Sequence, residues 1–139
     1  MKGYGQSMDR ICMLEKEVIE NIVKFSETKF LNRSLVAKIL KQSKNSKVTS
    51  RDFSGVGFFT YFQVDDKSLS LGNNINLQLG GIGAEIEGLK YNTAGFTLFI
   101  ENGMLALLEG YSYGDDKWPK KITNYKLYLI NPDGSLAWI

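Results

Sequence analysis

The first third of the chain carries apolar residues at the spacing of an amphipathic helix. Between residues 8 and 30, apolar side chains recur every three or four positions, and Glu15 is the only polar residue on their stripe. The same spacing recurs over residues 33–43, where Asn32 or Ser34 suits the N-cap position. The pattern predicts two helices, one over residues 8–30 and one over residues 33–43.

Beyond these helices the apolar pattern shortens to the period of a β-strand. Residues 42–50 are polar and are expected to begin as a loop, which makes them the seam between a helical start and a β-rich remainder. Val56–Val64 is rich in aromatic and β-branched residues, as strands are. Residues 84–89 alternate, with Ala84 and Ile86 on one face and two glutamates on the other. A last hairpin is expected to turn at residues 131–134, joining strands over 125–130 and 135–139.

The strongest local signal is Asn102-Gly103, a pair that favours the type I′ turn of a two-residue hairpin. Simple pairing outward from this turn places Ile100 opposite Leu105 and Leu98 opposite Leu107. Both faces of the resulting hairpin are apolar. We therefore expect it to be central in its sheet and covered on both sides.

These elements predict an α+β fold, with two N-terminal helices packed on one mainly antiparallel β-sheet. The 139 residues fit one domain, with a helical part over residues 1–47 and a β-rich part over residues 48–139. The first ten residues lack the apolar run of a signal peptide, and no apolar segment reaches the length needed to cross a bilayer. With a single cysteine the chain has no internal disulfide, so we expect a cytoplasmic protein without membrane contact.

The composition excludes several kinds of catalytic site. Histidine is absent, which removes the usual general base and the commonest metal ligand. Cys12 therefore lacks the usual activating partner, and its place on the apolar stripe predicts a buried structural residue. Gly80–Gly83 lacks the lysine and hydroxyl residue of a phosphate-binding loop and predicts a tight turn or bulge. We expect no cofactor, no metal and no catalytic residue.

Acidic and aromatic residues alternate in the segment that follows the Asn102-Gly103 hairpin. Tyrosine and tryptophan are common anchors of protein interfaces, and carboxylates favour a basic partner over a nucleic acid. The residues expected to bind a protein partner are Glu85, Glu87, Glu109, Tyr111, Tyr113, Asp115, Asp116 and Trp118. The Gly-Asp-Asp-Lys stretch at 114–117 is expected to be an exposed loop. A structural alternative stays open, in which Trp118 and the tyrosines cover the sheet edge instead of binding a partner.

Two other functions remain possible from the residues. One is a small carboxylate-dependent hydrolase that uses Glu85, Glu87 or Glu109 as acid and base. The other is a nucleic-acid-binding protein, because residues 1–50 hold an excess of basic residues and Lys38, Lys41, Lys44 and Lys47 lie on or just after the second helix.

The blocks GIGAEIEGL and GFTLFIENGMLALLEGYSYGDDKWP, within residues 80–119, carry a family resemblance. They resemble small bacterial proteins encoded beside polymorphic or contact-dependent growth inhibition toxins, where such proteins confer immunity. The resemblance implies a non-enzymatic cytoplasmic protein that binds one cognate toxin domain and blocks its active site or its access to substrate. Many such toxins are nucleases, whose basic clefts suit an acidic inhibitor. The resemblance transfers no contact residue to this chain.

Overall fold

The computed structural model describes residues 12–27, 31–89, 93–114 and 116–139 and has an α+β fold. Two helices precede a seven-stranded sheet, as the apolar pattern predicts. The helices are α1 (Met13–Glu27) and α2 (Arg33–Lys44), and a short 3₁₀ helix, η1, covers Lys67–Leu69. The strands are β1 (Ser46–Phe53), β2 (Gly57–Val64), β3 (Leu77–Ile86), β4 (Thr93–Glu101), β5 (Met104–Ser112), β6 (Tyr125–Ile130) and β7 (Leu136–Trp138).

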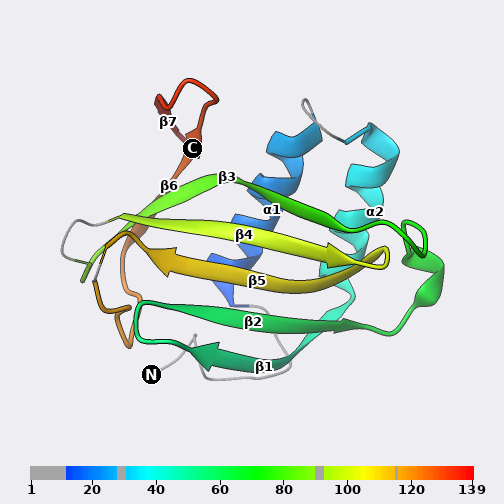
Figure 1. The fold of residues 1–139 in the computed structure, drawn as a ribbon, viewed down its shortest axis with the longest axis horizontal. Helices are drawn as coiled ribbons and strands as arrows, with labels where there is room; N and C mark the ends of the chain where they lie inside the picture. Colours follow the sequence, from blue (N-terminus) through cyan, green and yellow to red (C-terminus); the bar gives the residue numbers. More distant parts are fainter. Residues whose placement is uncertain (1–11, 28–30, 90–92, 115) are drawn as a thin grey trace.

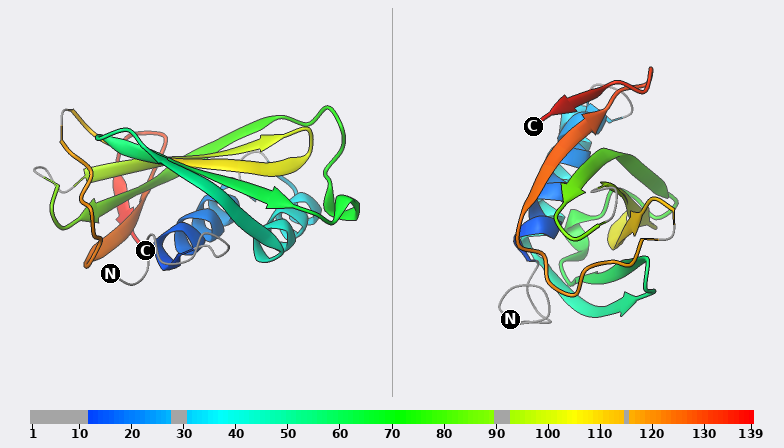
Figure 2. Two further views of the ribbon diagram at one scale, coloured as in Figure 1. Left: turned by 90° about the horizontal axis from the view of Figure 1, so that it is seen from below. Right: turned by 90° about the vertical axis from the view of Figure 1, so that its left-hand side faces the viewer.

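The sheet is antiparallel throughout and has the strand order β1-β2-β5-β4-β3-β6-β7. Both helices lie behind it in Figure 1 and beneath it in the left view of Figure 2. The apolar stripe of α1, which includes Val18, Ile19 and Ile22, is fully buried. The opposite face carries no helix in the described part of the chain, and we call it the open face. Figure 1 looks onto it.

The second helix and the final hairpin agree with the sequence, whereas the seam does not. Asn32 caps α2 by accepting a hydrogen bond from the Leu35 N–H at 2.9 Å. Residues 8–11 and 28–30 of the expected first helix lie outside the described residues. The polar seam over residues 42–50, expected to begin as a loop, is instead the end of α2 followed, after Asn45, by the first half of strand β1. The β1 part of this segment is rich in polar residues because β1 is an edge strand, on which only Val48 is buried.

The Asn102-Gly103 turn forms as predicted, with φ values of 51° and 79°, but a bulge changes the register behind it. Ile100 faces Leu105, and then Leu98 faces Leu108 instead of Leu107. The expected pairing was therefore wrong beyond Leu105, because Ala106 is the extra residue of a bulge. The hairpin is central, but the expectation that both its faces are covered was wrong: Phe99 and Leu107 are half-buried on the open face.

A buried glutamine fixes α2 to this hairpin. The Gln42 side chain donates to the carbonyl oxygens of Leu69 and Gly103 at 2.8 and 2.9 Å and accepts from the Leu105 N–H at 2.6 Å. The β2–β5 register ends at Tyr61 and Leu107, so the amide side chain supplies an acceptor where strand pairing stops. Its full set of partners explains why an uncharged polar group is tolerated at 0% exposure.

Glu15, the polar residue on the apolar stripe of the first helix, forms a buried ion pair with Arg51. Glu15 is 0% exposed, and its carboxylate accepts from the Arg51 guanidinium at 2.7 Å and 3.2 Å. It also accepts from the Thr60 hydroxyl and, at 3.1 Å, from the Cys12 N–H at the start of α1. The last contact is half of a capping box, since Glu15 is the third residue of the helix. One carboxylate thus joins the start of α1 to β1 and β2.

We predict that Arg51→Met lowers the free energy of unfolding by about 3–5 kcal/mol, because it leaves the Glu15 carboxylate buried without its counter-ion. The double variant Glu15→Leu/Arg51→Met should cost less than the sum of the two single changes. Urea unfolding followed by circular dichroism measures both.

The exposed pair of Lys47 and Asp65, at 3.4 Å, is the matched control. Lys47→Met should leave the urea midpoint unchanged, because solvent screens that pair. An unchanged midpoint for Arg51→Met would contradict the role assigned to the buried pair.

Candidate functional site

The open face carries a row of aromatic residues that crosses several strands. In the register, Tyr111 of β5 pairs with Gly95 of β4, which pairs with Gly83 of β3. Gly83 pairs in turn with Tyr128 of β6, and Tyr128 pairs with Trp138 of β7. Because paired residues project from the same face, the two tyrosines and the tryptophan stand in one line across the sheet.

The two glycines make room for the tyrosine rings. A Cβ at Gly95 would lie 2.7 Å from Cζ and Oη of Tyr111, and a Cβ at Gly83 would lie 2.6 Å from Cε1 and Cζ of Tyr128. Each ring therefore lies across the neighbouring strand, over a residue without a side chain. The hydroxyl ends converge over two paired glycines, whose Cα atoms are about 5 Å apart in such a pair.

Edge-to-face contacts extend this arrangement at both ends. Tyr113 packs on Tyr111 with ring centroids 5.8 Å apart and planes at 90°, and Trp138 packs on Tyr128 at 5.5 Å and 82°. Tyr128 is 4% exposed beneath its neighbours, whereas Tyr113 and Trp138 are 41% and 57% exposed. We call Tyr111, Tyr113, Tyr128 and Trp138 the aromatic row.

Two carboxylates flank the aromatic row on opposite sides. Glu109 lies two residues before Tyr111 on the same face of β5, and Glu85 lies two residues after Gly83 on the same face of β3. Glu85 is exposed and Glu109 is half-buried, so both meet solvent. Lys126 of β6 is the register partner of Glu85 of β3, and it brings a positive charge to the Glu85 side of the row.

The surroundings of the row disfavour phenolate. Burial, followed by the negative charge of Glu85, raises the pKa of Tyr128 above its ordinary value. Burial, followed by the effect of Tyr111, raises the pKa of Tyr113. Both hydroxyls are therefore neutral at physiological pH, and each offers one proton and acceptor lone pairs to a bound group.

The structure brings four of the predicted partner-binding residues to this face: Glu85, Glu109, Tyr111 and Tyr113. Trp118 lies elsewhere. It is 7% exposed and packs on Phe58 at 5.1 Å and on Phe96 at 6.5 Å, within the core on the helix side of the sheet. Trp118 is therefore a core residue beside the interior strands β2 and β4, and it does not cover the edge of the sheet.

The segment before Trp118 is also less exposed than expected. Asp116 is 8% exposed, and its carbonyl oxygen accepts from the Ser112 hydroxyl at 2.6 Å. The expectation of an exposed Gly-Asp-Asp-Lys loop was wrong at Asp116, because the chain turns inward there to bury Trp118. Asp115 lies outside the described residues.

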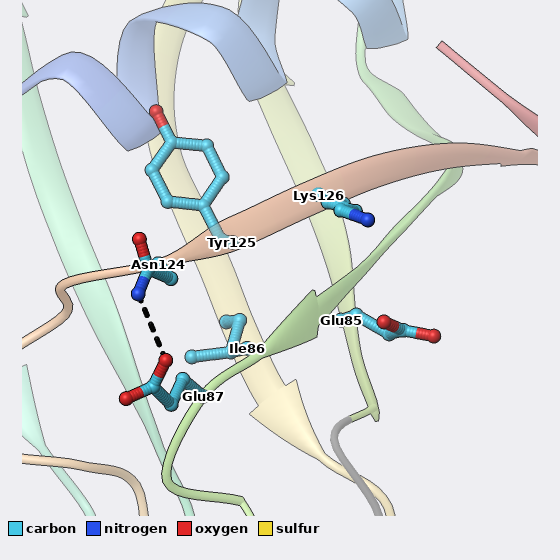
Figure 3. A pocket seen from close by; sticks show the side chains of 6 residues that line it. All are labelled: Glu85, Ile86, Glu87, Asn124, Tyr125 and Lys126. Carbon is cyan, nitrogen blue, oxygen red and sulfur yellow. Dashed lines mark hydrogen bonds between the residues drawn. The ribbon is translucent and has the colours of Figure 1, made fainter.

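Glu87 lies just beyond the end of β3, at a shallow pocket of about 360 Å³ (Figure 3). Its carboxylate accepts from the Asn124 amide at 2.8 Å. Glu85 lines the same pocket, but the two carboxylates point away from each other in Figure 3. The ring of Tyr125 points toward α1, where its hydroxyl donates to Glu17. The pocket therefore does not direct two acids at one point.

The basic surface of α2 lies apart from the aromatic row. Lys38, Lys41 and Lys44 line a shallow pocket of about 450 Å³ on that helix. Hydrogen bonds from the Ser68 side chain and backbone lower the pKa of the Asp66 carboxyl, and the charge of Lys41 acts in the same direction as a smaller cause. The helix presents positive charge without the aromatic residues found on the open face.

Sequence reasoning missed Tyr128 and Trp138. The hairpin expected at residues 131–134 already implied that strands over 125–130 and 135–139 pair, and this pairing holds. The sequence did not indicate which other strand lies beside this hairpin in the sheet. Only the β3–β6 pairing places Tyr128 beside Gly83 and thereby joins two aromatic segments that are distant in the chain.

No family model, curated protein or solved structure matches this chain. Within the described residues, no group of three or more acidic, histidine or cysteine side chains has the geometry to hold a metal ion. No helix among the described residues is long and apolar enough to cross a membrane.

Cys12 is partly buried, and its thiol is held in the protonated form. Burial, followed by the charge of Glu15, raises its pKa from 9.0 to about 12. The folded state holds this proton more tightly, so the thiol's contribution to stability is complete below pH 9.0 and declines as pH rises toward about 12.

We predict that Cys12 reacts with a thiol-exchange reagent at about pH 8 at least about a hundredfold more slowly in the native protein than in denaturing urea. The colour released by an aromatic disulfide reagent measures both rates. Equal rates would show that the native thiol ionises normally.

We also predict that Trp118→Ala destabilises the fold more than Tyr113→Ala, because Trp118 lies in the core and Tyr113 lies at the surface. Trp118→Ala should cost about 3–5 kcal/mol of stability, because it leaves a cavity beside two phenylalanines. Tyr113→Ala should cost about 1 kcal/mol or less, since it removes one partly exposed ring contact. Thermal and urea unfolding measure both, and a larger loss for Tyr113→Ala would contradict this division.

Proposed function

We propose that this chain is an immunity protein that binds a cognate toxin domain in the cytoplasm and neutralises it without catalysis. The observation that carries the proposal is the open face, on which the aromatic row, with Tyr113 and Trp138 exposed, lies between two carboxylates. Tyrosine and tryptophan supply large contact areas with few rotatable bonds, which makes them frequent centres of protein interfaces. The resemblance of residues 80–119 to immunity proteins supports the same function.

The charge on this face suits a nuclease as the toxin. A nuclease binds phosphate through a basic cleft, and carboxylates such as Glu85 and Glu109 complement such a cleft. A protein bound there blocks the active site or the entry of substrate. Complementary charge also speeds encounter, which helps an inhibitor that must capture a toxin before it acts.

Neither alternative gains comparable support. A hydrolase needs two carboxylates directed at one substrate bond, and Glu85 and Glu87 diverge at their shared pocket. A nucleic-acid-binding surface on α2 would rest on exposed lysines, which are common on the outer faces of helices. The proposed protein is therefore neither an enzyme nor a direct binder of nucleic acid.

The proposal predicts that the gene immediately upstream encodes a large secreted protein, and the test is co-expression of this chain with the C-terminal domain of that protein. That domain should be lethal when expressed alone and harmless when expressed with this chain, and the two proteins should co-purify. Tyr111→Ala should weaken the complex by about 2 kcal/mol or more if the ring is a central anchor.

The matched control is Lys38→Ala on α2, which should leave affinity unchanged. Lack of protection together with lack of a complex would contradict the immunity function. Protection that is lost with Lys38→Ala and kept with Tyr111→Ala would move the interface to the helical side.

A further inference from the structure

The centre of the aromatic row brings phenol groups together above paired glycines. The phenol ends of Tyr111 and Tyr128 converge over Gly95 and Gly83, so oxygen atoms gather above the glycine pair. Tyr113 extends the aromatic surface on the Tyr111 side and Trp138 on the Tyr128 side.

Negative charge reaches this centre from two directions. Glu109 projects beside Tyr111 from β5, and Glu85 projects beside Gly83 and Tyr128 from β3. Burial raises the pKa of Tyr128 most, and the negative charge of Glu85 raises it further, which agrees with the position of Glu85 beside this phenol. Lys126 opposes it on the β6 side only.

We propose that the aromatic row is the seat of an arginine or lysine side chain presented by a basic segment of a protein partner. The exposed rings of Tyr113 and Trp138 attract a cation, the half-buried Tyr111 offers a phenol oxygen to its N–H groups, and Glu85 and Glu109 neutralise its charge. An arginine suits the seat best, because its planar guanidinium stacks on an aromatic ring while its edge forms hydrogen bonds.

Charge and shape together select this occupant. A phosphate or a nucleic acid would face two carboxylates, and a purely apolar segment would leave both of them beside a dry surface. This inference rests on the proposed function, because a toxin domain with a basic cleft is the partner that would carry the cation. It adds the chemistry of the central contact.

The direct test is a titration of the full chain with a capped peptide of alternating arginine and glycine. The control peptide replaces each arginine by citrulline, which keeps the shape and removes the charge. Two-dimensional NMR of the aromatic side chains reports where each peptide binds. The arginine peptide should shift the signals of Tyr111, Tyr113, Tyr128 and Trp138, and added salt should reduce its affinity.

Variants that neutralise one charge show whether that charge strengthens or weakens binding of the arginine peptide. Glu85→Gln and Glu109→Gln should each weaken the arginine peptide about two- to fivefold, whereas Lys126→Gln should tighten it by a similar factor. Glu101→Gln is the matched control, because it lies about 20 Å along β4 from Gly95 and should change nothing. Both flanking glutamates meet solvent, and unchanged amide signals elsewhere will show that the variants stay folded.

Equal binding of the citrulline peptide, or shifts confined to α2, would overturn the cation seat. So would an affinity that Glu85→Gln and Glu109→Gln leave unchanged.

The two proposals fail in different ways. An arginine peptide that binds on the row, with no toxin domain bound or neutralised, overturns the immunity function and leaves the seat. A toxin domain whose binding ignores both glutamates, with no arginine peptide on the row, overturns the seat and leaves the immunity function.

Discussion

The buried pair of Glu15 and Arg51 is the constraint on which the arrangement of the two layers depends. A carboxylate at 0% exposure is tolerable only with its donors in place, and these come from β1, from β2 and from the start of α1. Displacement of α1 along the sheet would separate the carboxylate from the guanidinium. The ion pair therefore favours the docking position that α1 occupies on the sheet.

Gln42 fixes the second helix in a comparable way with uncharged groups. Its amide binds backbone atoms of η1 and of the β4–β5 hairpin, so α2 is held where strand pairing with β2 has ended. With both helices held on one face, Tyr113 and Trp138 on the opposite face meet solvent. Gly83 and Gly95 then determine how those side chains lie, because their missing Cβ atoms admit the rings of Tyr128 and Tyr111. The candidate binding surface thus results from two features: the helices cover only the other face of the sheet, and Gly83 pairs with Gly95 on this one.

Much of this architecture is predictable from the sequence, and the errors have identifiable causes. The helical stripes, the Asn102-Gly103 turn and the final hairpin are local features, so their residues suffice to predict them. The bulge at Ala106 is not local, since it depends on Leu105 reaching Gln42 and on Leu108 reaching the core. Glu15 looked like a break in a stripe because its partner Arg51 lies in a strand that is mostly polar.

Half of the aromatic row was found from its acidic, tyrosine-rich segment, while Tyr128 and Trp138 required the β3–β6 pairing. Trp118 was ambiguous because an aromatic residue after a polar turn is equally suited to an interface and to a core.

The account's central claim is that the open face, and not the helical face, receives the partner. Hydrogen–deuterium exchange of this chain, alone and in complex with the cognate toxin domain that the proposal requires, tests the claim most directly. The predicted result is slower exchange over residues 107–113 and 126–138, with unchanged exchange over α2. Slower exchange confined to residues 33–44, with the open face unaffected, would contradict it.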